Sequence, residues 1–217
     1  NALTTSQWNI KDLEGMFRDD AWLNGNDNYW DMMTQNAVTQ DYNISLRGGT
    51  KSNSYYASFN YKDQDGIVKG SNTRYYGARF NFEGTVREKL KLGFNMDASA
   101  REANQKDNMI SQIINMRPDY PAYAEDGTIN QYSFQIKNPL LELLDVNKSS
   151  ARNFNGSLFL EYDILPCLKF RTTGNIVYSN VKYETHNSAF YSDDTNSGSQ
   201  SATQSYTMVW DNLLTFY

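Results

Sequence analysis

The side chains able to act in catalysis are few in this chain. His186 is the only histidine among 217 residues, and it stands in a segment rich in Thr, Asn and Ser. One histidine excludes a two-histidine zinc site, and a Ser-His-Asp triad would depend on this single residue. We therefore interpret His186 as an ordinary loop residue and predict no catalytic residues and no enzyme activity.

Carboxylate and amide oxygens form a second chemical group, because hard cations such as Ca²⁺ take oxygen ligands. They occur at short spacing in residues 63–66 (DQDG) and 24–28 (NGNDN). Neither segment has the distal acidic residue that completes a calcium-binding loop. A turn without metal is the favoured interpretation of both, although loops of this kind can bind calcium. We predict no metal site and no cofactor.

Net charge and cysteine count exclude further classes. The formal net charge is −5, which argues against a nucleic-acid partner. Cys167 is the only cysteine, so no internal disulfide can form. No basic segment followed by an apolar one opens the chain, so we expect no signal peptide within it.

Alternating apolar and polar residues indicate the elements that must position these groups. Successive side chains of a β-strand lie on opposite faces of the sheet. Four alternating segments follow one another between residues 42 and 101, and two more lie at 154–163 and 168–179. A seventh, 206–217, is strand-like, but its faces cannot be assigned from the pattern. The predicted apolar face of the first six consists of Tyr42, Ile44, Leu46, Tyr55, Ala57, Phe59, Tyr61, Tyr76, Ala78, Phe80, Phe82, Leu90, Leu92, Phe94, Met96, Ala98, Ala100, Phe154, Leu158, Leu160, Tyr162, Leu168, Phe170, Ile176 and Tyr178.

The lengths of these segments favour a membrane β-barrel. A tilted strand needs about 9–11 residues to cross a bilayer, and strands of soluble proteins average nearer 5–6. No run approaches the roughly 18 apolar residues of a transmembrane helix. We predict an all-β fold: a partial antiparallel transmembrane β-barrel of about seven strands in an open curved sheet, with long extracellular loops and minor helix in them. A soluble β-sandwich also alternates and is the alternative.

Connection lengths orient the strands. Bacterial barrels keep periplasmic turns short and extracellular loops long, which places the short turns 48–51, 86–89 and 164–167 in the periplasm. The chain then divides into a first extracellular loop (1–38), strands with short turns (39–103), a long extracellular loop (104–150), a hairpin (151–182), a further extracellular loop (183–205) and a strand (206–217). Weakly helical patches are predicted at 6–18 and 29–35, and an upward strand is expected before residue 1.

Aromatic side chains divide between the membrane borders and the loops. Amphipathic rings favour the headgroup level, so we place Tyr55, Tyr61, Phe82, Tyr162 and Tyr178 in interfacial girdles. Six rings belong to the loop segments: Trp22, Tyr29, Trp30, Tyr120, Tyr123 and Tyr132. They could stack on sugar faces or contact a partner protein, or they could bury one another in folded loops.

Four segments resemble the SusC/RagA family of TonB-dependent outer-membrane transporters from Bacteroidetes. They are residues 29–33 (YWDMM), 40–50 (QDYNISLRGGT), 55–70 (YYASFNYKDQDGIVKG), and the hairpin formed by 74–81 with 90–93. A looser similarity covers the long loop at Arg117-Pro118, Pro121, Asp126-Gly127 and Asn138-Pro139-Leu140. The resemblance extends over most of the chain, in the same order, and does not specify a substrate.

This resemblance implies an importer of oligosaccharides or peptides. Members of the family have a barrel of about 22 strands plugged by an N-terminal domain, are opened by a TonB complex and are closed outside by a SusD-like lipoprotein. The expected localisation is the outer membrane, in contact with its lipid. The plug and the TonB-contacting segment are not among these residues, so no energy-coupling residue can be assigned. A stand-alone secreted or surface glycan-binding β-sandwich is the alternative.

Charged residues of both signs are predicted on the lumen wall. They are Arg47, Arg79, Glu83, Asp97, Arg101, Glu161 and Arg171, together with Asp163. They could pair with one another, contact a polar substrate or dock the plug. Because the resemblance implies a plug that fills the lumen, docking is favoured over substrate contact.

Overall fold

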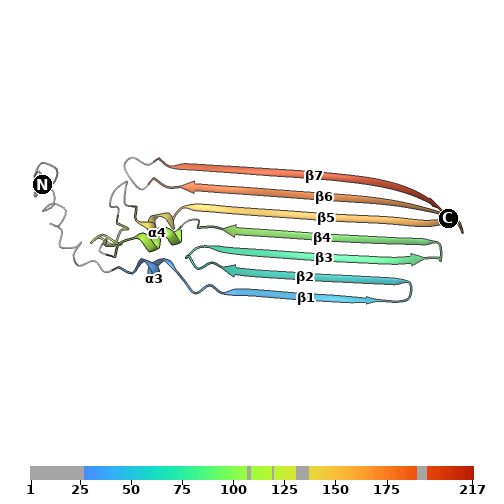
Figure 1. The fold of residues 1–217 in the computed structure, drawn as a ribbon, viewed down its shortest axis with the longest axis horizontal. Coiled ribbons are helices and arrows are strands. Elements are labelled where there is room, and N and C mark those ends of the chain that lie inside the picture. The colour runs from blue at the N-terminus through green and yellow to red at the C-terminus, as the bar shows by residue number, and fades with distance from the viewer. Residues whose placement is uncertain (1–26, 107–108, 119, 131–136, 190–194) are drawn as a thin grey trace, which may run out of the picture.

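A single antiparallel sheet forms most of the molecule. The computed structural model describes residues 27–106, 109–118, 120–130, 137–189 and 195–217. Its strands are β1 (Thr39–Gly49), β2 (Asn53–Asp65), β3 (Asn72–Val86), β4 (Leu90–Asn104), β5 (Val146–Leu165), β6 (Leu168–Asn187) and β7 (Ser197–Phe216). Each strand pairs with the next in sequence, giving the order β1-β2-β3-β4-β5-β6-β7 (Figure 1). The open, seven-stranded all-β sheet predicted from the alternation is therefore confirmed.

Short turns and long connections lie at opposite ends of this sheet. The β1–β2, β3–β4 and β5–β6 turns share one end with the C-terminus, while the longer connections lie at the other (Figure 1). Three short helices accompany the long connections: α3 (Tyr29–Met33), α4 (Met109–Asn115) and α5 (Pro139–Glu142). No helix of the described residues is long and apolar enough to cross a membrane.

The strand register gathers the apolar side chains on one face. One continuous row across all seven strands is Leu46, Ala57, Phe80, Met96, Gly156, Ile176 and Met208. The same pairing assigns β7, whose Tyr206, Met208 and Trp210 join this side. We call it the apolar face and the opposite side the polar face. Tyr42, Tyr61 and Tyr76 form a neighbouring row, with ring centroids 6.2 and 5.1 Å apart, and this row borders the apolar face toward the long connections.

No protein covers the apolar face among the described residues. Ile44 is 70% exposed and Trp210 65% exposed. On β4 the apolar side chains run from Leu90 to Ala100, a distance that corresponds to about 26 Å along the membrane normal at about 3.4 Å per residue and a tilt of about 40°. The outward band of a bacterial barrel is about 25 Å tall. The apolar face therefore has the height that a bilayer requires.

The uncovered apolar face decides between the predicted β-barrel and the alternative β-sandwich. In a sandwich, Tyr55, Phe59, Phe80, Phe94 and Met96 would be buried against a second sheet. The register places all five on the apolar face of one sheet, and the structure describes no second sheet. The sandwich alternative is therefore wrong for the described residues.

Three strands are longer than the sequence pattern predicted. β5, β6 and β7 each have 20 residues, so the expected loop 183–205 is wrong at both ends, and the predicted hairpin 151–182 extends to 146–187. Most of the extra residues are polar on both faces, which removes the alternation used to recognise a strand. Backbone pairing continues through them, and Thr185 and Ser199 hydrogen-bond through their hydroxyls at 2.7 Å.

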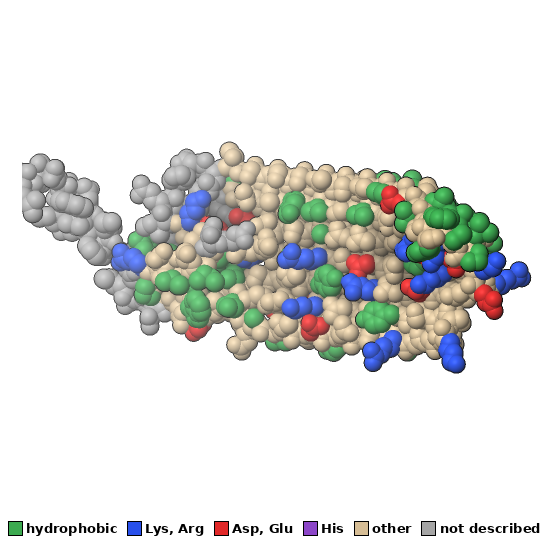
Figure 2. All heavy atoms as spheres, turned by 45° about the vertical axis from the view of Figure 1, so that its right-hand side comes forward, with side chains coloured by type: hydrophobic (Ala, Val, Ile, Leu, Met, Phe, Trp, Pro, Cys, Tyr) green, Lys and Arg blue, Asp and Glu red, His purple; other side chains and the backbone are tan. Residues whose placement is uncertain are grey.

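Charged side chains occupy the polar face. Arg79 and Asp97 are direct cross-strand partners there, as are Arg171 and Glu161. Figure 2 shows acidic and basic side chains beside one another over the middle of the sheet and toward its short-turn end. The apolar rows carry no charge in that region, so the face turned toward the viewer is the polar one.

One aromatic ring on the polar face depends on a facing glycine. Phe159 on β5 lies directly opposite Gly93 on β4 and is buried. The Arg171 guanidinium lies over its ring, 4.3 Å from the centroid. A Cβ at residue 93 would overlap the Phe159 ring, so the glycine provides the space in which the ring lies.

We predict that Gly93→Ala lowers the free energy of unfolding by about 1–3 kcal/mol, because the added methyl group displaces a buried ring. Denaturant unfolding in lipid vesicles, followed by tryptophan fluorescence, measures this change. Gly198→Ala is the matched control: a Cβ there meets its neighbours only at ordinary contact distance. Equal stability of the two variants would contradict the proposed role of Gly93.

Candidate functional site

A folded cluster of loops lies at the long-connection end of the sheet. Its buried core consists of Tyr29, Met33, Val68, Met109, Ile113, Ala122 and Leu140. These residues come from the segment before β1, the β2–β3 connection and the long β4–β5 connection. We call this cluster the loop platform. It has a hydrophobic core of its own, so the platform presents its outer side chains from a fixed framework.

Backbone hydrogen bonds tie the separate segments of the platform together. The Gln35 N–H donates to the Ile67 carbonyl at 2.8 Å, and the Lys69 N–H donates to the Met33 carbonyl at 2.9 Å. The Asp27 N–H donates to the Pro118 carbonyl at 3.0 Å. Residues distant in sequence thus satisfy one another's backbone groups, as buried loops require.

Asn138 is the polar centre of the long connection. Its side chain is fully buried. Its Nδ2 donates to the carbonyls of Ala122 and Asn130 at 2.9 and 3.0 Å, and its Oδ1 accepts from the Leu140 N–H at 3.1 Å. This last bond caps α5 at its N-terminus. The Asn138 side-chain amide therefore links the loop segment that contains Ala122 and Asn130 to the start of helix α5.

Lys106 fastens the two ends of the same connection. Its ammonium donates to the carbonyls of Leu143, at 2.8 Å, and Asp145. Burial lowers the pKa of this lysine, while the nearby Asp145 carboxylate partly opposes the change. The contact brings the beginning of the β4–β5 connection against its end, beside the start of β5.

The loop aromatics predicted as contact residues separate into two groups. Tyr29 and Tyr120 are only 3% and 6% exposed, and the Tyr29 hydroxyl donates to the Tyr120 carbonyl at 3.0 Å. Both side chains support the platform from within, so they leave the set of candidate contact residues. Trp30 and Tyr123 are 44% and 50% exposed and remain in it. Trp22 and Tyr132 lie outside the described residues.

The predicted lumen charges all lie on the polar face, and most are paired there. Arg79 donates to Asp97 at 3.1 Å, Lys91 approaches Glu83 at 2.5 Å, and Lys169 approaches Glu161 at 3.1 Å. Arg171 lies 3.6 Å from Glu161. Lys91, Lys169 and Phe159 were not among the predicted lumen residues. The alternation within β4 and β6 nevertheless places Lys91 and Lys169 on the same face as the charged residues that were predicted.

Two cations of that set have no ion pair in the described part of the chain. Arg47 and Arg101 are exposed on the polar face, and no carboxylate of the described residues lies within 4 Å of either guanidinium. An unpaired guanidinium presents five donors in a planar fork, which suits carboxylates and carbonyls of a neighbouring surface. Arg47 and Arg101 are therefore candidate contact residues for a neighbouring surface, and Lys62 on the same face also has no ion pair among the described residues.

Among the described residues, the candidate metal and catalytic side chains do not assemble into a site; residues 24–26 of the segment 24–28 lie outside the described residues. Residues 63–65 end β2 and Gly66 follows it; the Asp63 carboxylate accepts from Tyr61 and Arg74. His186 lies near the end of β6. The described residues contain no group of three His, Cys, Asp or Glu side chains that could hold a metal ion.

Comparison of sequences relates this chain to TonB-dependent receptors. It is 29% identical over 173 residues to TonB-dependent receptor P26 of Formosa agariphila, covering 76% of this chain and 17% of that protein. It is 30% identical over 105 residues to TonB-dependent receptor SusC of Bacteroides thetaiotaomicron, covering 46% of this chain and 10% of SusC. These relatives are receptors, not enzymes. No protein-family model matches the chain.

Solved structures support the same fold. The RagAB peptide transporter superposes with a TM-score of 0.69 at 18% identity, covering 99% of this chain and 28% of the compared chain. The closed-closed state of the RagAB peptide importer gives a TM-score of 0.66 at 19% identity, over 88% and 23%. The predicted resemblance to a barrel segment of SusC/RagA-type receptors is therefore confirmed, and the chain spans less than a third of the proteins it matches.

We predict that Asn138→Leu loosens the loop platform, because it leaves the Asn130 carbonyl and the Leu140 N–H without their Asn138 partner, at a cost of about 1–3 kcal/mol for each buried unsatisfied group. The Ala122 carbonyl keeps its hydrogen bond from the Asn130 N–H. Hydrogen–deuterium exchange measures the effect as faster exchange in residues 120–130 and 138–145. Asn115→Leu, at an exposed position of α4, is the matched control. Unchanged exchange in the Asn138 variant would show that the amide does not hold the platform together.

Proposed function

We propose that this chain forms part of the barrel of a TonB-dependent outer-membrane importer. In this proposal the apolar face contacts lipid, the polar face lines the lumen and the loop platform lies outside the cell. The observation that carries the proposal is the two-faced sheet: the apolar face is uncovered, has the height of a bilayer and opposes a face rich in charge.

The rest of the barrel would come from strands beyond this chain. β1 and β7 each leave one edge without a partner strand among the described residues. A membrane cannot hydrogen-bond exposed backbone groups, so a spanning sheet must close on itself. We propose that neighbouring strands of the full-length protein pair with both edges.

The proposed solute is an oligosaccharide or a peptide, captured with a SusD-like lipoprotein. A matched solved structure is described as a peptide importer, which supports the peptide class; the oligosaccharide class rests on the resemblance of the sequence segments to the SusC/RagA family. Trp30 and Tyr123 are exposed on the platform, and exposed rings can stack on a sugar or pack against a peptide or a lid protein. The loop platform gives these rings a rigid support.

A two-part experiment tests the proposed membrane orientation and transport. With Cys167 first replaced by Ser, Ala98→Cys on the apolar face and Ser99→Cys on the polar face receive nitroxide spin labels in the full-length protein. We expect oxygen to broaden the residue 98 signal more than a polar nickel chelate does, and the reverse at residue 99. The opposite pattern would overturn the orientation.

The second part of the experiment measures transport. It compares cells from which the full-length gene has been deleted with the same cells after the gene has been put back. Radiolabelled oligosaccharides and peptides are offered separately. We expect the gene to restore accumulation of one class and a protonophore to abolish it, because TonB-dependent import needs the inner-membrane proton gradient. Accumulation of neither class, with the protein present in the outer membrane, would contradict import.

We predict that Trp30→Ala and Tyr123→Ala each weaken solute or lipoprotein binding by roughly tenfold, as loss of a contact aromatic does. Calorimetric titration of the purified full-length protein gives the dissociation constants. Trp210→Ala removes an even more exposed ring from the apolar face and is expected to leave the dissociation constants unchanged. If all three variants bind as the original protein does, the platform rings are not contact residues.

Docking of a plug is the role we propose for Arg47 and Arg101, two unpaired cations of the polar face. We expect Arg47→Gln together with Arg101→Gln to loosen the plug and raise the entry of a bulky antibiotic several-fold. Growth inhibition by vancomycin measures this leak. Lys51→Gln, an exposed cation in the β1–β2 turn, is the control. Sensitivity equal to that of the control would exclude a docking role for the two arginines.

A further inference from the structure

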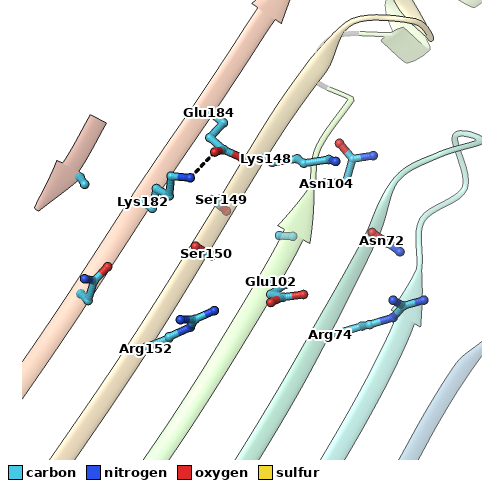
Figure 3. Close-up of a pocket in the computed structure, with 13 residues that line it drawn as sticks. Asn72, Arg74, Glu102, Asn104, Lys148, Ser149, Ser150, Arg152, Lys182 and Glu184 are labelled. Atoms are coloured by element: carbon cyan, nitrogen blue, oxygen red, sulfur yellow. Dashed lines mark hydrogen bonds and ion pairs between the residues drawn. The ribbon is translucent and has the colours of Figure 1, made fainter. Parts of the chain in front are cut away.

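A charged hollow lies on the apolar side of the sheet, toward the loop platform. It has a volume of about 730 Å³ and crosses β3 to β7. Its charged lining residues are Arg74, Glu102, Lys148, Arg152, Lys182 and Glu184 (Figure 3). The register places these side chains on the same side as the apolar rows. This charged hollow therefore faces away from the polar face and has no part in lining the lumen.

Its depth matches the headgroup layer of a membrane. Arg74 and Asn72 lie two and four residues beyond Tyr76, the border of the apolar band. At about 3.4 Å per residue and a tilt of about 40°, these steps correspond to about 5 and 10 Å along the membrane normal. The polar layer on each side of a bilayer is about 5–8 Å thick. Arg152 lies in the same row as Tyr76, and Lys148 lies in the same row as Asn72. Under the proposed orientation, the charged hollow therefore crosses the headgroup layer of the outer leaflet and extends a few ångströms beyond it.

The charges of the hollow are only partly neutralised. Lys182 pairs with Glu184, and Arg74 pairs with Asp63 at 3.2 Å. Lys148 and Arg152 on β5 are exposed, and no carboxylate of the described residues lies within 4 Å of either cationic group. The local cationic excess contrasts with the net charge of −5 for the whole chain. An anion is thus the ligand that the two free cations would bind.

An acceptor group accompanies these cations. Glu102 lines the hollow, is exposed, and has no ion pair in the described residues. Carboxylate oxygens accept hydrogen bonds from hydroxyl groups. Cations beside a free acceptor fit a phosphorylated sugar better than a bare phosphate, which offers no donor to the acceptor when fully ionised.

An apolar hollow continues from the same strands toward the short turns. It has a volume of about 320 Å³ and lies above Gly156 and Gly174, where the absence of side chains leaves space between taller neighbours. Phe94, Leu158, Ile176 and Trp210 form part of its wall. A hydrocarbon chain fits such a wall, and its polar end would point toward the charged hollow.

We propose that β3 to β7 bind a phosphorylated glycolipid of the outer leaflet. Lys148 and Arg152 hold its phosphate, the exposed Glu102 carboxylate accepts from sugar hydroxyls, and an acyl chain occupies the apolar hollow. The inference rests on the proposed membrane orientation and adds a specific lipid site to it. The solute path lies on the opposite face, so this site is separate from transport.

The test measures glycolipid retained by the full-length protein after detergent purification from outer membranes. Mass spectrometry of the extracted lipid gives the molar ratio of phosphorylated glycolipid to protein. We expect Lys148→Glu with Arg152→Glu to reduce retention by at least about tenfold, because two charge-assisted contacts become repulsive. Lys62→Glu with Lys51→Glu makes the same change in net charge away from the hollow and is expected to retain the original ratio.

Delipidated protein distinguishes the sources of the phosphate. It is titrated with lipid A, with dephosphorylated lipid A and with inorganic phosphate, and we expect the first to bind at least about tenfold more tightly than the others. Equal binding of inorganic phosphate, equal binding of dephosphorylated lipid, or full retention by the Lys148/Arg152 variant would each overturn the lipid site. If the residue 98 and 99 labels still report the expected orientation, only this inference fails and the proposed function stands.

Discussion

The hydrogen-bonded register between neighbouring strands is the constraint on which the other features depend. A slip of one residue would transfer every side chain of a strand to the opposite face. With the observed register, Ile44 to Tyr206 and Leu46 to Met208 form continuous apolar rows. The same pairing brings Arg79 against Asp97 and Phe159 against Gly93 on the other side. Lipid contact, charge pairing and the two hollows all follow from one alignment.

The sequence predicted the strands wherever one face is apolar and the other polar. Side chains such as Phe80 and Asn81 carry that signal directly, and both lie on the faces expected for them. The signal ends where a strand passes beyond the apolar band, so residues 197–205, polar on both faces, read as loop. β7 could be assigned only from its pairing with β6, because Val209 and Leu213 interrupt the polar side.

The candidate site was less accessible to sequence reasoning because its contacts join distant segments. Trp30 and Tyr29 are adjacent and both aromatic, yet one is exposed and the other buried beside Tyr120. No local pattern separates them, since burial depends on the β2–β3 and β4–β5 connections meeting the segment before β1. The charged hollow was missed for a related reason: Arg74, Arg152 and Lys182 become neighbours only through the register.

The length of the β4–β5 connection has a consequence for the way the sheet assembles. Six pairings join strands adjacent in sequence, and three of them close across very short turns. Closing roughly 40 residues instead of 3 costs about 2 kcal/mol more in chain entropy. The contacts of Lys106 with Leu143 and Asp145 draw the two ends of that connection together and so shorten the effective gap. Variation in this loop is therefore expected to alter the rate at which β5 joins β4, and with it the yield of mature protein, even where solute recognition is untouched.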